Sequence, residues 1–390
     1  MVKRNVVVAA LGTTQTLAWG SSYYLPAILA EPIAGGLGLS RAMVFGLFSG
    51  ALLLSAFLGP AVGRAIDNRG GRGVLVLSNV VLAAGLVLLA LAQGIIGLAA
   101  AWTMLGVGMA LGLYDSAFAT LTGLYGREAR APITGITLIA GFASTIGWPL
   151  SAFLDASLGW RGGCLIWAAL NLLVCLPLNR LLIPRAPPPE HAPEPEGSPT
   201  AAPRAAMPIL AFVFAATWFV TGAMAAHMPH LLEIAGASST AAIAAAALVG
   251  PAQVAARLVE FGALRWSHPL VSARIAAALH PVGAGILLAV GAPAIVVFAL
   301  FHGAGNGLLT IAKGTLPLAI FGPIGYGLRN GILAAPARAA QATSPLIFGL
   351  LMDWLGVGAL AISAGMSIAA LLALMGLRAR TSPAAVPSRA

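Results

Sequence analysis

Long apolar runs dominate the chain, and short groups of charged, glycine and proline residues separate them. A helix that crosses a bilayer needs about 20 mainly apolar residues, and one run after another reaches this length. The pattern therefore predicts an all-α protein with twelve membrane-spanning helices. The predicted spans are residues 5–30, 41–62, 73–93, 97–123, 132–154, 162–183, 207–232, 240–262, 269–290, 293–318, 326–352 and 357–377.

The composition leads to the same class of protein. Of the 390 residues, 59% are hydrophobic and only 8% are charged, whereas a soluble domain carries about 25% charged residues. This balance excludes a soluble globular protein, a disordered chain and a nucleic-acid-binding domain. The two cysteines, Cys164 and Cys175, both lie in apolar runs, so we expect neither a disulfide framework nor a thiolate metal cluster.

Basic residues predict the orientation, because Lys and Arg near helix ends stay on the cytoplasmic side of a membrane. The chain has 21 Lys and Arg against 11 Asp and Glu, a net charge of +10. With the N-terminus inside, Arg41 and Arg161 are the only basic residues in the predicted outer loops. We therefore expect both termini in the cytoplasm and a location in the bacterial cytoplasmic (inner) membrane.

A proline-rich segment with several glutamates, residues 184–206, interrupts the apolar pattern. Such a segment can neither span a bilayer nor bury a core, so it predicts a solvated cytoplasmic linker. The predicted domains are a six-helix bundle over residues 1–183 and a second six-helix bundle with a short cytoplasmic tail over residues 207–390.

The two predicted bundles share an internal repeat. The helices predicted as second and eighth both carry Gly-Pro, followed by Arg64-x-x-Asp67 in one and Arg257-x-x-Glu260 in the other. Coincidence is the alternative, since Gly and Pro are common in membrane helices, but the repeat favours two pseudo-symmetric halves around a midplane site. A shift of 196 residues also superposes Gly126 on Gly322, Gly135 on Gly331 and Pro149 on Pro345.

The loop after the second predicted span reads Gly63-Arg64-Ala65-Ile66-Asp67-Asn68-Arg69-Gly70-Gly71-Arg72. This loop resembles the cytoplasmic Gly-x-x-x-Asp-x-x-Gly-x-Arg motif of the major facilitator superfamily. The resemblance implies the major facilitator fold, with 12 transmembrane helices in two pseudo-symmetric six-helix bundles, and transport by alternating access. It also implies that the motif residues take part in gating; a merely solvated turn is the alternative. These residues are Gly63, Asp67, Arg69, Gly70 and Arg72.

In that superfamily the first, fourth, seventh and tenth helices line a central cavity. In the first predicted helix, Gln15, Trp19 and Tyr23 share one face. In the tenth, His302 and Asn306 begin a polar stripe that continues to Thr310 and Lys313. Polar side chains in a membrane are costly unless they face protein or water. We expect both stripes to line the substrate site, while hydrogen bonding between helices is the alternative for each residue.

Charged residues inside the predicted spans give a sharper indication. Asp115 lies eleven residues before Gly126, which is about 16 Å along a helix. A carboxylate at that depth could carry a proton, or it could pair with an Arg. Arg338 lies near the middle of the eleventh span and needs an acid, carbonyl groups, water or an anionic substrate.

The segment Gln253-x-x-x-Arg257 resembles helix eight of monocarboxylate and oxalate/formate transporters. That resemblance implies that Arg257 binds a substrate carboxylate and that Arg338 is the second cation of the oxalate branch. Pairing with Glu260 three residues on is the alternative for Arg257. The family's acidic residue is Gln253 here, and its helix-one lysine is Ala27. Asp115 or Glu260 would therefore have to couple a proton.

The seventh predicted span offers a competing metal site in Met224, His227 and Met228. Thioether and imidazole ligands suit Cu(I), and the spacing resembles the Met-x-x-x-Met motif of copper-importing facilitator proteins. No matching pair occurs in the eighth span, and methionine also packs ordinary cores. We expect no resident metal, and copper uptake stays a weak alternative. Efflux of amphiphilic drugs is a serious alternative.

Together these features predict a secondary active transporter, a symporter or antiporter, for a small organic anion. No His-Glu-x-x-His, Gly-x-Ser-x-Gly or phosphate-binding loop occurs in the sequence, so we expect no enzyme. We expect the partners to be a small anionic substrate and the lipid bilayer, with no nucleic acid and no cofactor. We expect the protein to be a monomer.

Overall fold

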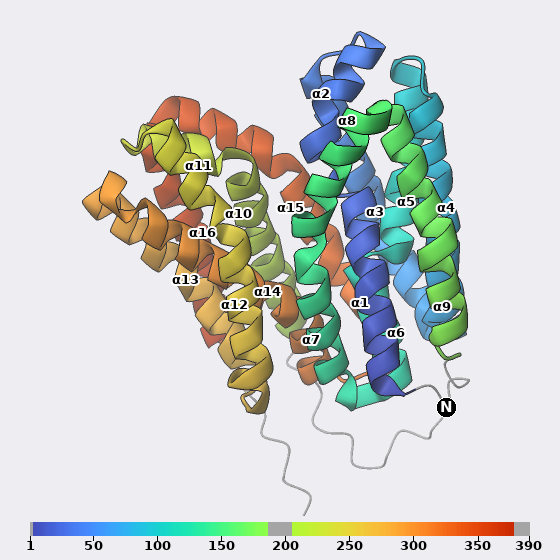
Figure 1. Ribbon diagram of the computed structural model, residues 1–390. Helices are drawn as coiled ribbons and strands as arrows, with labels where there is room; N and C mark the ends of the chain where they lie inside the picture. The colour runs from blue at the N-terminus through green and yellow to red at the C-terminus, as the bar shows by residue number, and fades with distance from the viewer. Residues whose placement is uncertain (1–2, 186–204, 378–390) are drawn as a thin grey trace, which may run out of the picture.

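The computed structural model describes residues 3–185 and 205–377, and all regular structure in these residues is helical. The first half of the chain forms one group of helices and the second half forms another beside it (Figure 1). The helices of the first group are α1 Arg4–Ser21, α2 Leu25–Leu37, α3 Arg41–Arg69, α4 Gly71–Leu91, α5 Ile95–Gly112, α6 Tyr114–Tyr125, α7 Arg130–Ile139, α8 Ala143–Leu170 and α9 Leu176–Leu182.

The second group begins after the segment whose residues 186–204 lie outside the described residues. Most of the predicted linker falls there, so the proposed domain boundaries stay a prediction. The helices of the second group are α10 Ala206–Ile234, α11 Ser239–Ala247, α12 Val249–Gly262, α13 Pro269–Val290, α14 Ile295–Phe321, α15 Tyr326–Leu355 and α16 Ala359–Met375.

Some of the predicted spans are interrupted rather than continuous. The first breaks between α1 and α2, where Pro26 occupies the first turn of α2, a position that needs no backbone N–H donor. The fourth breaks at Leu113, whose extended backbone ends α5 and starts α6. This second break places Asp115 in the first turn of α6, near the positive end of the helix dipole.

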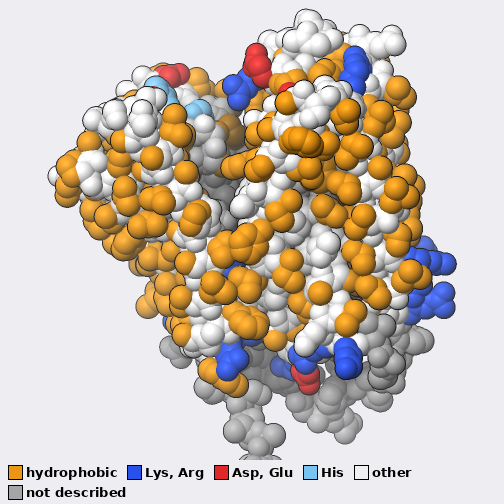
Figure 2. All heavy atoms as spheres, viewed as in Figure 1, with side chains coloured by type: hydrophobic (Ala, Val, Ile, Leu, Met, Phe, Trp, Pro, Cys, Tyr) orange, Lys and Arg blue, Asp and Glu red, His pale blue; other side chains and the backbone are white. Residues whose placement is uncertain are grey.

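Among the described residues, eight stretches of consecutive helices are long and apolar enough to cross a membrane. The stretch Ile95–Leu182 has 88 residues and the stretch Tyr326–Met375 has 50, each more than one crossing of about 20 residues requires. The surface drawn in Figure 2 is correspondingly apolar over most of its side. Large apolar side chains are exposed, among them Phe57 at 82% and Trp354 at 85%. Side chains of this kind are stable at such a surface when lipid covers them. The number of twelve crossings stays a prediction.

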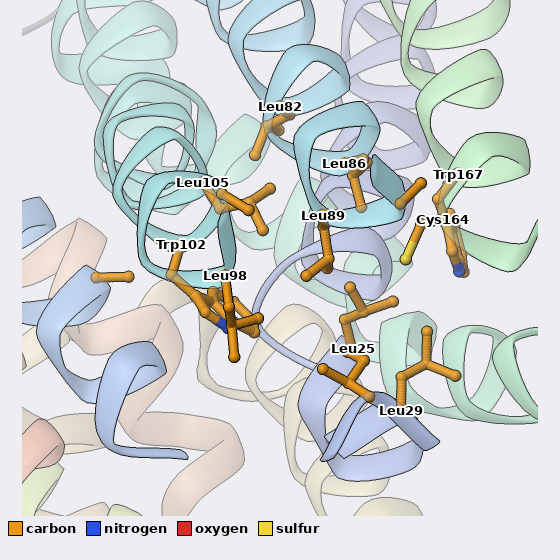
Figure 3. Close-up of a cluster of buried hydrophobic side chains, with 14 of the residues drawn as sticks. Leu25, Leu29, Leu82, Leu86, Leu89, Leu98, Trp102, Leu105, Cys164 and Trp167 are labelled. Carbon is orange, nitrogen blue, oxygen red and sulfur yellow. The ribbon is translucent and has the colours of Figure 1, made fainter. Parts of the chain in front are cut away.

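One core cluster of the first half includes large apolar side chains from α2, α4, α5 and α8 (Figure 3). Leu25 and Leu29 of α2 lie near Leu86 of α4, Trp102 of α5 and Trp167 of α8, and all five are buried. Each buried side chain of this size contributes about 1.5–3 kcal/mol when it leaves water. Inside a membrane that term is smaller, so close packing contributes more of the stability.

The two halves touch at the end of the molecule that carries the N-terminus (Figure 1). There the Asp67 carboxylate of α3 accepts hydrogen bonds from the backbone N–H groups of Gly327 and Leu328, each at 2.8 Å. Gly63 faces Gly327 so closely that a Cβ on either residue would collide with backbone. We call this the closed end. At the opposite, open end the surface is hollowed between the halves (Figure 2).

Candidate functional site

Three charged side chains meet between the halves, and we call them the central charge cluster. The Asp115 carboxylate of α6 lies 2.9 Å from Lys313 Nζ of α14 and 2.6 Å from an Arg338 guanidinium nitrogen of α15. Asn330 of α15 donates a further hydrogen bond to Asp115 at 3.2 Å, and Arg338 also donates to Ser55 Oγ of α3. One acid from the first half thus holds two cations of the second.

The cluster is buried and carries an excess of positive charge. Side-chain exposures are 7% for Lys313, 11% for Arg338 and 12% for Asp115, so water screens these charges weakly. Two cations and one acid leave a net charge of +1. The indole ring of Trp218 in α10 lies 5.0 Å from Lys313 Nζ and adds a cation–π contact. A second anion could therefore bind here with favourable electrostatics.

Arg257 adds a further buried cation, 4% exposed, on α12. It donates to the Thr137 carbonyl at 3.1 Å and to Gln253 Oε1 at 3.4 Å, but its Nε is buried without a partner among the described residues. An unpartnered donor on a buried guanidinium is unfavourable, so this group has a hydrogen bond available for a ligand.

Aromatic side chains of the first half lie next to these charges. The Trp19 ring centroid is 5.1 Å from Tyr23, 5.9 Å from Tyr24 and 5.0 Å from Tyr114. Trp148 of α8 lies 5.8 Å from Tyr24. We call these five residues the aromatic cluster. Because Tyr114 directly precedes Asp115, the aromatic cluster and the central charge cluster adjoin.

Only some residues of the polar stripe predicted in the first helix lie in this region. Tyr23 reaches across the halves, since Gln341 Nε2 of α15 donates to its hydroxyl at 2.8 Å. Gln15 lies elsewhere: it is buried and donates to the Gly112 carbonyl at 2.6 Å, which ties α1 to the end of α5. Its contact matches the helix-joining alternative rather than a cavity-lining role.

The predicted stripe of the tenth helix also divides. Lys313 joins the central charge cluster, whereas His302 turns into the second half and lies 3.0 Å from His280 of α13 through the two Nδ1 atoms. Asn306 accepts a hydrogen bond from Thr221 of α10 at 3.3 Å. Among the described residues neither His302 nor Asn306 shares a hydrogen bond with Gln15, Trp19 or Tyr23, and their part in the substrate site stays a prediction. Residues on one helix can face different neighbours when several helices surround it.

Glu260 does not form the ion pair with Arg257 that the sequence offered as the alternative role of that arginine. It lies 3.1 Å from an Arg130 guanidinium nitrogen of α7 and accepts a 2.5 Å hydrogen bond from Ser272 Oγ. Arg130 also donates to the carbonyl groups of Ser267 and Leu264. Glu260 thus belongs to the closed end and not to the buried centre.

The gating motif lies where α3 passes into α4. Asp67 binds the start of α15, as described above, and Gly63 allows the close approach of that helix. Gly70 ends α3 with a φ of 77°, a conformation that favours glycine. Arg69 is exposed and Arg72 half-buried at the closed end. The motif residues therefore stand at a contact between the halves.

The residues of the weak copper alternative do not converge. Met224 and Met228 are buried in the apolar core of the second half, whereas His227 Nε2 lies 2.7 Å from the Pro345 carbonyl. Among the described residues no group of three or more His, Cys, Asp or Glu side chains could hold a metal ion. Apolar packing accounts for both methionines.

Sequence reasoning missed two members of the region, Tyr114 and Asn330. It placed Lys313 in a polar stripe expected to line the substrate site, but not in a cluster of charges. A lysine within an apolar helix is costly, so Lys313 carried a signal as strong as that of Arg338. Tyr114 and Asn330 gave no such signal in the sequence, because isolated uncharged polar residues are common in such helices.

Residues 11–287, more than half of the chain, match the sequence family described as the Major Facilitator Superfamily. The chain belongs to the major facilitator superfamily. The protein is therefore an integral membrane protein of a family of secondary transporters, not of enzymes. A relative of similar length is an uncharacterized 38 kDa protein in the 23S RNA operon of Thermoproteus tenax, 29% identical over 367 residues that cover 92% of each chain.

Solved structures share the major facilitator fold. The human organic anion transporter MFSD10 (TETRAN) has 16% identity and a TM-score of 0.74 over 96% of this chain and 100% of that one. The proton:xylose symporter XylE has 15% identity and a TM-score of 0.73 over 96% of each. The E. coli fucose:proton symporter FucP has 15% identity and a TM-score of 0.69 over 95% and 98%. At these identities the likeness concerns the fold.

Proposed function

We propose that this transporter moves a small organic anion, a carboxylate, across the membrane by alternating access. The observation that carries the proposal is the excess of buried positive charge between the halves: Lys313, Arg338 and Arg257 against Asp115. Burying an unbalanced cation costs free energy, and an anionic substrate removes that cost. A neutral or cationic substrate would leave it in place.

In this proposal the guanidinium groups of Arg338 and Arg257 bind the carboxylate. Their planar donor pairs match a carboxylate in a bidentate geometry. Lys313 contributes a third charge, and the aromatic cluster packs against the apolar part of the substrate. This assignment agrees with the resemblance of Gln253-x-x-x-Arg257 to the monocarboxylate and oxalate/formate branch. The name of MFSD10, an organic anion transporter, supports the same substrate class.

Asp115 acts as the resident counter-ion in this proposal. With Lys313 at 2.9 Å and Arg338 at 2.6 Å, its negative charge is well stabilised, which makes it a poor proton carrier. A substrate carboxylate that takes over one cation from Asp115 would weaken the link between the halves.

Alternating access then requires the closed end to open while the open end closes. The Asp67 hydrogen bonds to α15 and the Arg130–Glu260 ion pair would break in that step. We propose that the closed end faces the cytoplasm, because Arg64 and Arg69 near the end of α3, and Arg127 just after α6, lie at that end. Both termini and the segment between the halves would then be cytoplasmic.

A thermal-shift screen of the purified protein tests the substrate class. The ligands are formate, lactate, oxalate and succinate, with xylose, tetraphenylphosphonium and Cu(I) as representatives of sugar, drug and metal transport. We expect a rise in unfolding temperature with at least one carboxylate and none with the other three. Arg257→Gln and Arg338→Gln should each weaken carboxylate binding at least about tenfold, because a hydrogen bond to a charged group is lost.

Arg274→Gln is the matched control for both variants. Arg274 is a cation of the same half, but it donates to the Leu374 and Leu377 carbonyl groups and does not contact the central charge cluster. Carboxylate binding should be unchanged in it. If Arg338→Gln does not fold, Arg338→Lys provides the second test, since it keeps the charge but loses the bidentate geometry. Stabilisation by xylose, tetraphenylphosphonium or Cu(I) alone would contradict the proposal.

A further inference from the structure

A second polar group lies inside the second half, away from the central charge cluster. His280 of α13, His302 of α14 and Ser363 of α16 form a hydrogen-bonded row, and all three side chains are buried. His302 precedes Lys313 by eleven residues on α14, about 16 Å along the helix. The row therefore belongs to one half, whereas the central charge cluster joins both.

The hydrogen bonds determine which nitrogen atoms carry protons. Ser363 Oγ donates to the Leu360 carbonyl at 2.9 Å, so it accepts from His280 Nε2 at 3.0 Å. A neutral imidazole has one N–H group, which leaves His280 Nδ1 as an acceptor. His302 Nδ1 must then donate to it at 3.0 Å, and His302 Nε2 is left as a bare acceptor.

The Nε2 atom of His302 has no protein partner among the described residues. Unlike the buried polar atoms that lack a partner and are inaccessible, it keeps some accessible surface. His302 and His280 line a small cavity of about 20 Å³. A cavity needs roughly 10–15 Å³ to hold a water molecule, which in turn needs polar partners. Asn306 and Thr221 line the same cavity and supply them.

Among the described residues, no titratable group other than His280 and His302 lines the cavity beside the row. The side chains facing it are Thr217 and Thr221 from α10, Asn306 from α14, and Ser363 and Ser367 from α16, besides His280 and His302 themselves. No charged side chain lines the cavity in the described chain. A proton on this row would be stabilised by hydrogen bonds alone.

We propose that His302 is a proton-binding site of the second half, served by a water molecule in the adjacent cavity. A hydrated proton transfers to the bare Nε2 of His302 and leaves neutral water behind. The imidazolium keeps its Nδ1–H bond to His280, which becomes a stronger, charge-assisted bond. No covalent bond other than this N–H forms and no electron is transferred.

This site deepens the proposed function, and only its transport consequence rests on that function. Protonation places a positive charge on α14, the helix that also carries Lys313. In a carboxylate transporter it would supply a coupled proton, a role for which Asp115 is poorly suited because two cations hold its carboxylate. A pair of histidines that only joins helices is the competing structural role.

Solid-state NMR of the full chain in liposomes, labelled with ¹³C and ¹⁵N at histidine, tests the proton site without any substrate. Imidazole ¹⁵N shifts separate N–H from bare nitrogen. Near pH 8 we expect His302 in the Nδ1–H form and His280 in the Nε2–H form. As the pH falls to about 4, His302 should gain a second N–H before His280 does. His302→Gln and His280→Gln assign the signals, and His230→Gln is the matched control for an exposed histidine.

Ser363→Ala keeps both imidazoles and provides the second variant. It removes the acceptor of His280 Nε2, so the populations of the two N–H forms should change at both histidines. The proposal fails if His302 carries its proton on Nε2 near pH 8, if it stays neutral down to about pH 4, or if Ser363→Ala changes neither histidine.

The transport consequence is tested with lactate in proteoliposomes. We expect His302→Gln to lose most of the accumulation of lactate that a pH gradient drives, by at least about tenfold, because no proton is then coupled to uptake. Undiminished gradient-driven accumulation in this variant would overturn the coupling role. If the wild type binds a proton at His302 but no carboxylate, the proposed function fails and the proton site stands.

Discussion

Two of the sets of contacts that join the halves differ in chemistry. The central charge cluster is built only from side chains: Asp115, Lys313 and Arg338. At the closed end, Asp67 binds backbone N–H groups, and Arg130, 24% exposed, binds backbone carbonyl groups besides Glu260, which is 2% exposed. Water can replace the backbone partners of Asp67 and Arg130 as they separate, whereas the two cations of the centre need another anion. The difference suggests that a substrate acts at the centre and that the closed end only follows.

The two closed-end contacts also differ from each other, although they stand at equivalent places in the sequence repeat. Arg64-x-x-Asp67 ends α3, and Arg257-x-x-Glu260 lies near the end of α12. Asp67 receives two N–H groups at the start of α15, an arrangement that also favours its charge through the helix dipole. Glu260 instead pairs with an arginine near the start of α7. The two acidic residues thus occupy equivalent positions in the repeat but bind different partners.

Asp115→Asn should have the largest effect, because it removes the one acid between two buried cations. Removing one partner of a buried ion pair costs about 3–5 kcal/mol. We therefore expect thermal unfolding of the purified variant, followed by circular dichroism, at a clearly lower temperature. Glu128→Gln is the matched control: its ion pair with Arg4 is exposed and contributes at most about 1 kcal/mol. Equal unfolding temperatures of these two variants would contradict the comparison.

Glu260→Gln should have an intermediate effect of about 1–3 kcal/mol, the contribution of a hydrogen bond to a charged group. The closed end should open more often, since Arg130 loses its acid partner. Pulsed electron paramagnetic resonance between spin labels at Glu128→Cys and Arg265→Cys measures the distance across that end. We expect a larger share of long distances than in the labelled parent. An unchanged distance distribution would assign Glu260 a role within its own half.

The smallest expected effect is the pH dependence of stability that a histidine at the closed end causes. Burial, Arg130 and Arg274 hold the pKa of His268 below its ordinary value of 6.5. The folded state therefore binds a proton there less readily than the unfolded state does, and stability is lost as the pH falls through 6.5. His268 Nδ1 accepts from Leu270 N, and asparagine can replace that helix cap.

Unfolding temperatures of the wild type and His268→Asn measure this effect between about pH 8 and pH 5.5. We expect the wild type to lose more stability on acidification than the variant, because only the wild type takes up the extra proton on unfolding. The same loss in both proteins would show that other groups, and not His268, sense the acid.

The sequence alone was sufficient for the fold class. Apolar runs of membrane-spanning length have few alternatives to helices, because every backbone polar group must be satisfied inside a bilayer. The Gly63-to-Arg72 loop then indicated the superfamily, which the match over residues 11–287 shows. The interruptions at Ser22 to Tyr24 and at Leu113 were not predicted, since a break that costs little hydrophobicity leaves the apolar pattern intact.

The sequence indicated individual residues of the candidate site but not how these residues are arranged in space. Asp115 and Arg338 each stood out as charges in apolar helices, yet 223 positions separate them in the chain. Periodicity relates residues within one helix, so it placed Lys313 and His302 on a common stripe. In the structure Lys313 binds Asp115, and His302 binds His280.

The sequence by itself thus determined that this chain is a helical membrane transporter and which costly polar residues it keeps inside the membrane. Hydrophobicity and local motifs are properties of short segments, and they can be read without the fold. Only the tertiary structure decided which charges neutralise one another, and that Glu260 belongs to the closed end while Arg257 keeps a free donor. Electrostatic pairing acts over a few ångströms, and those distances exist only once the helices have packed.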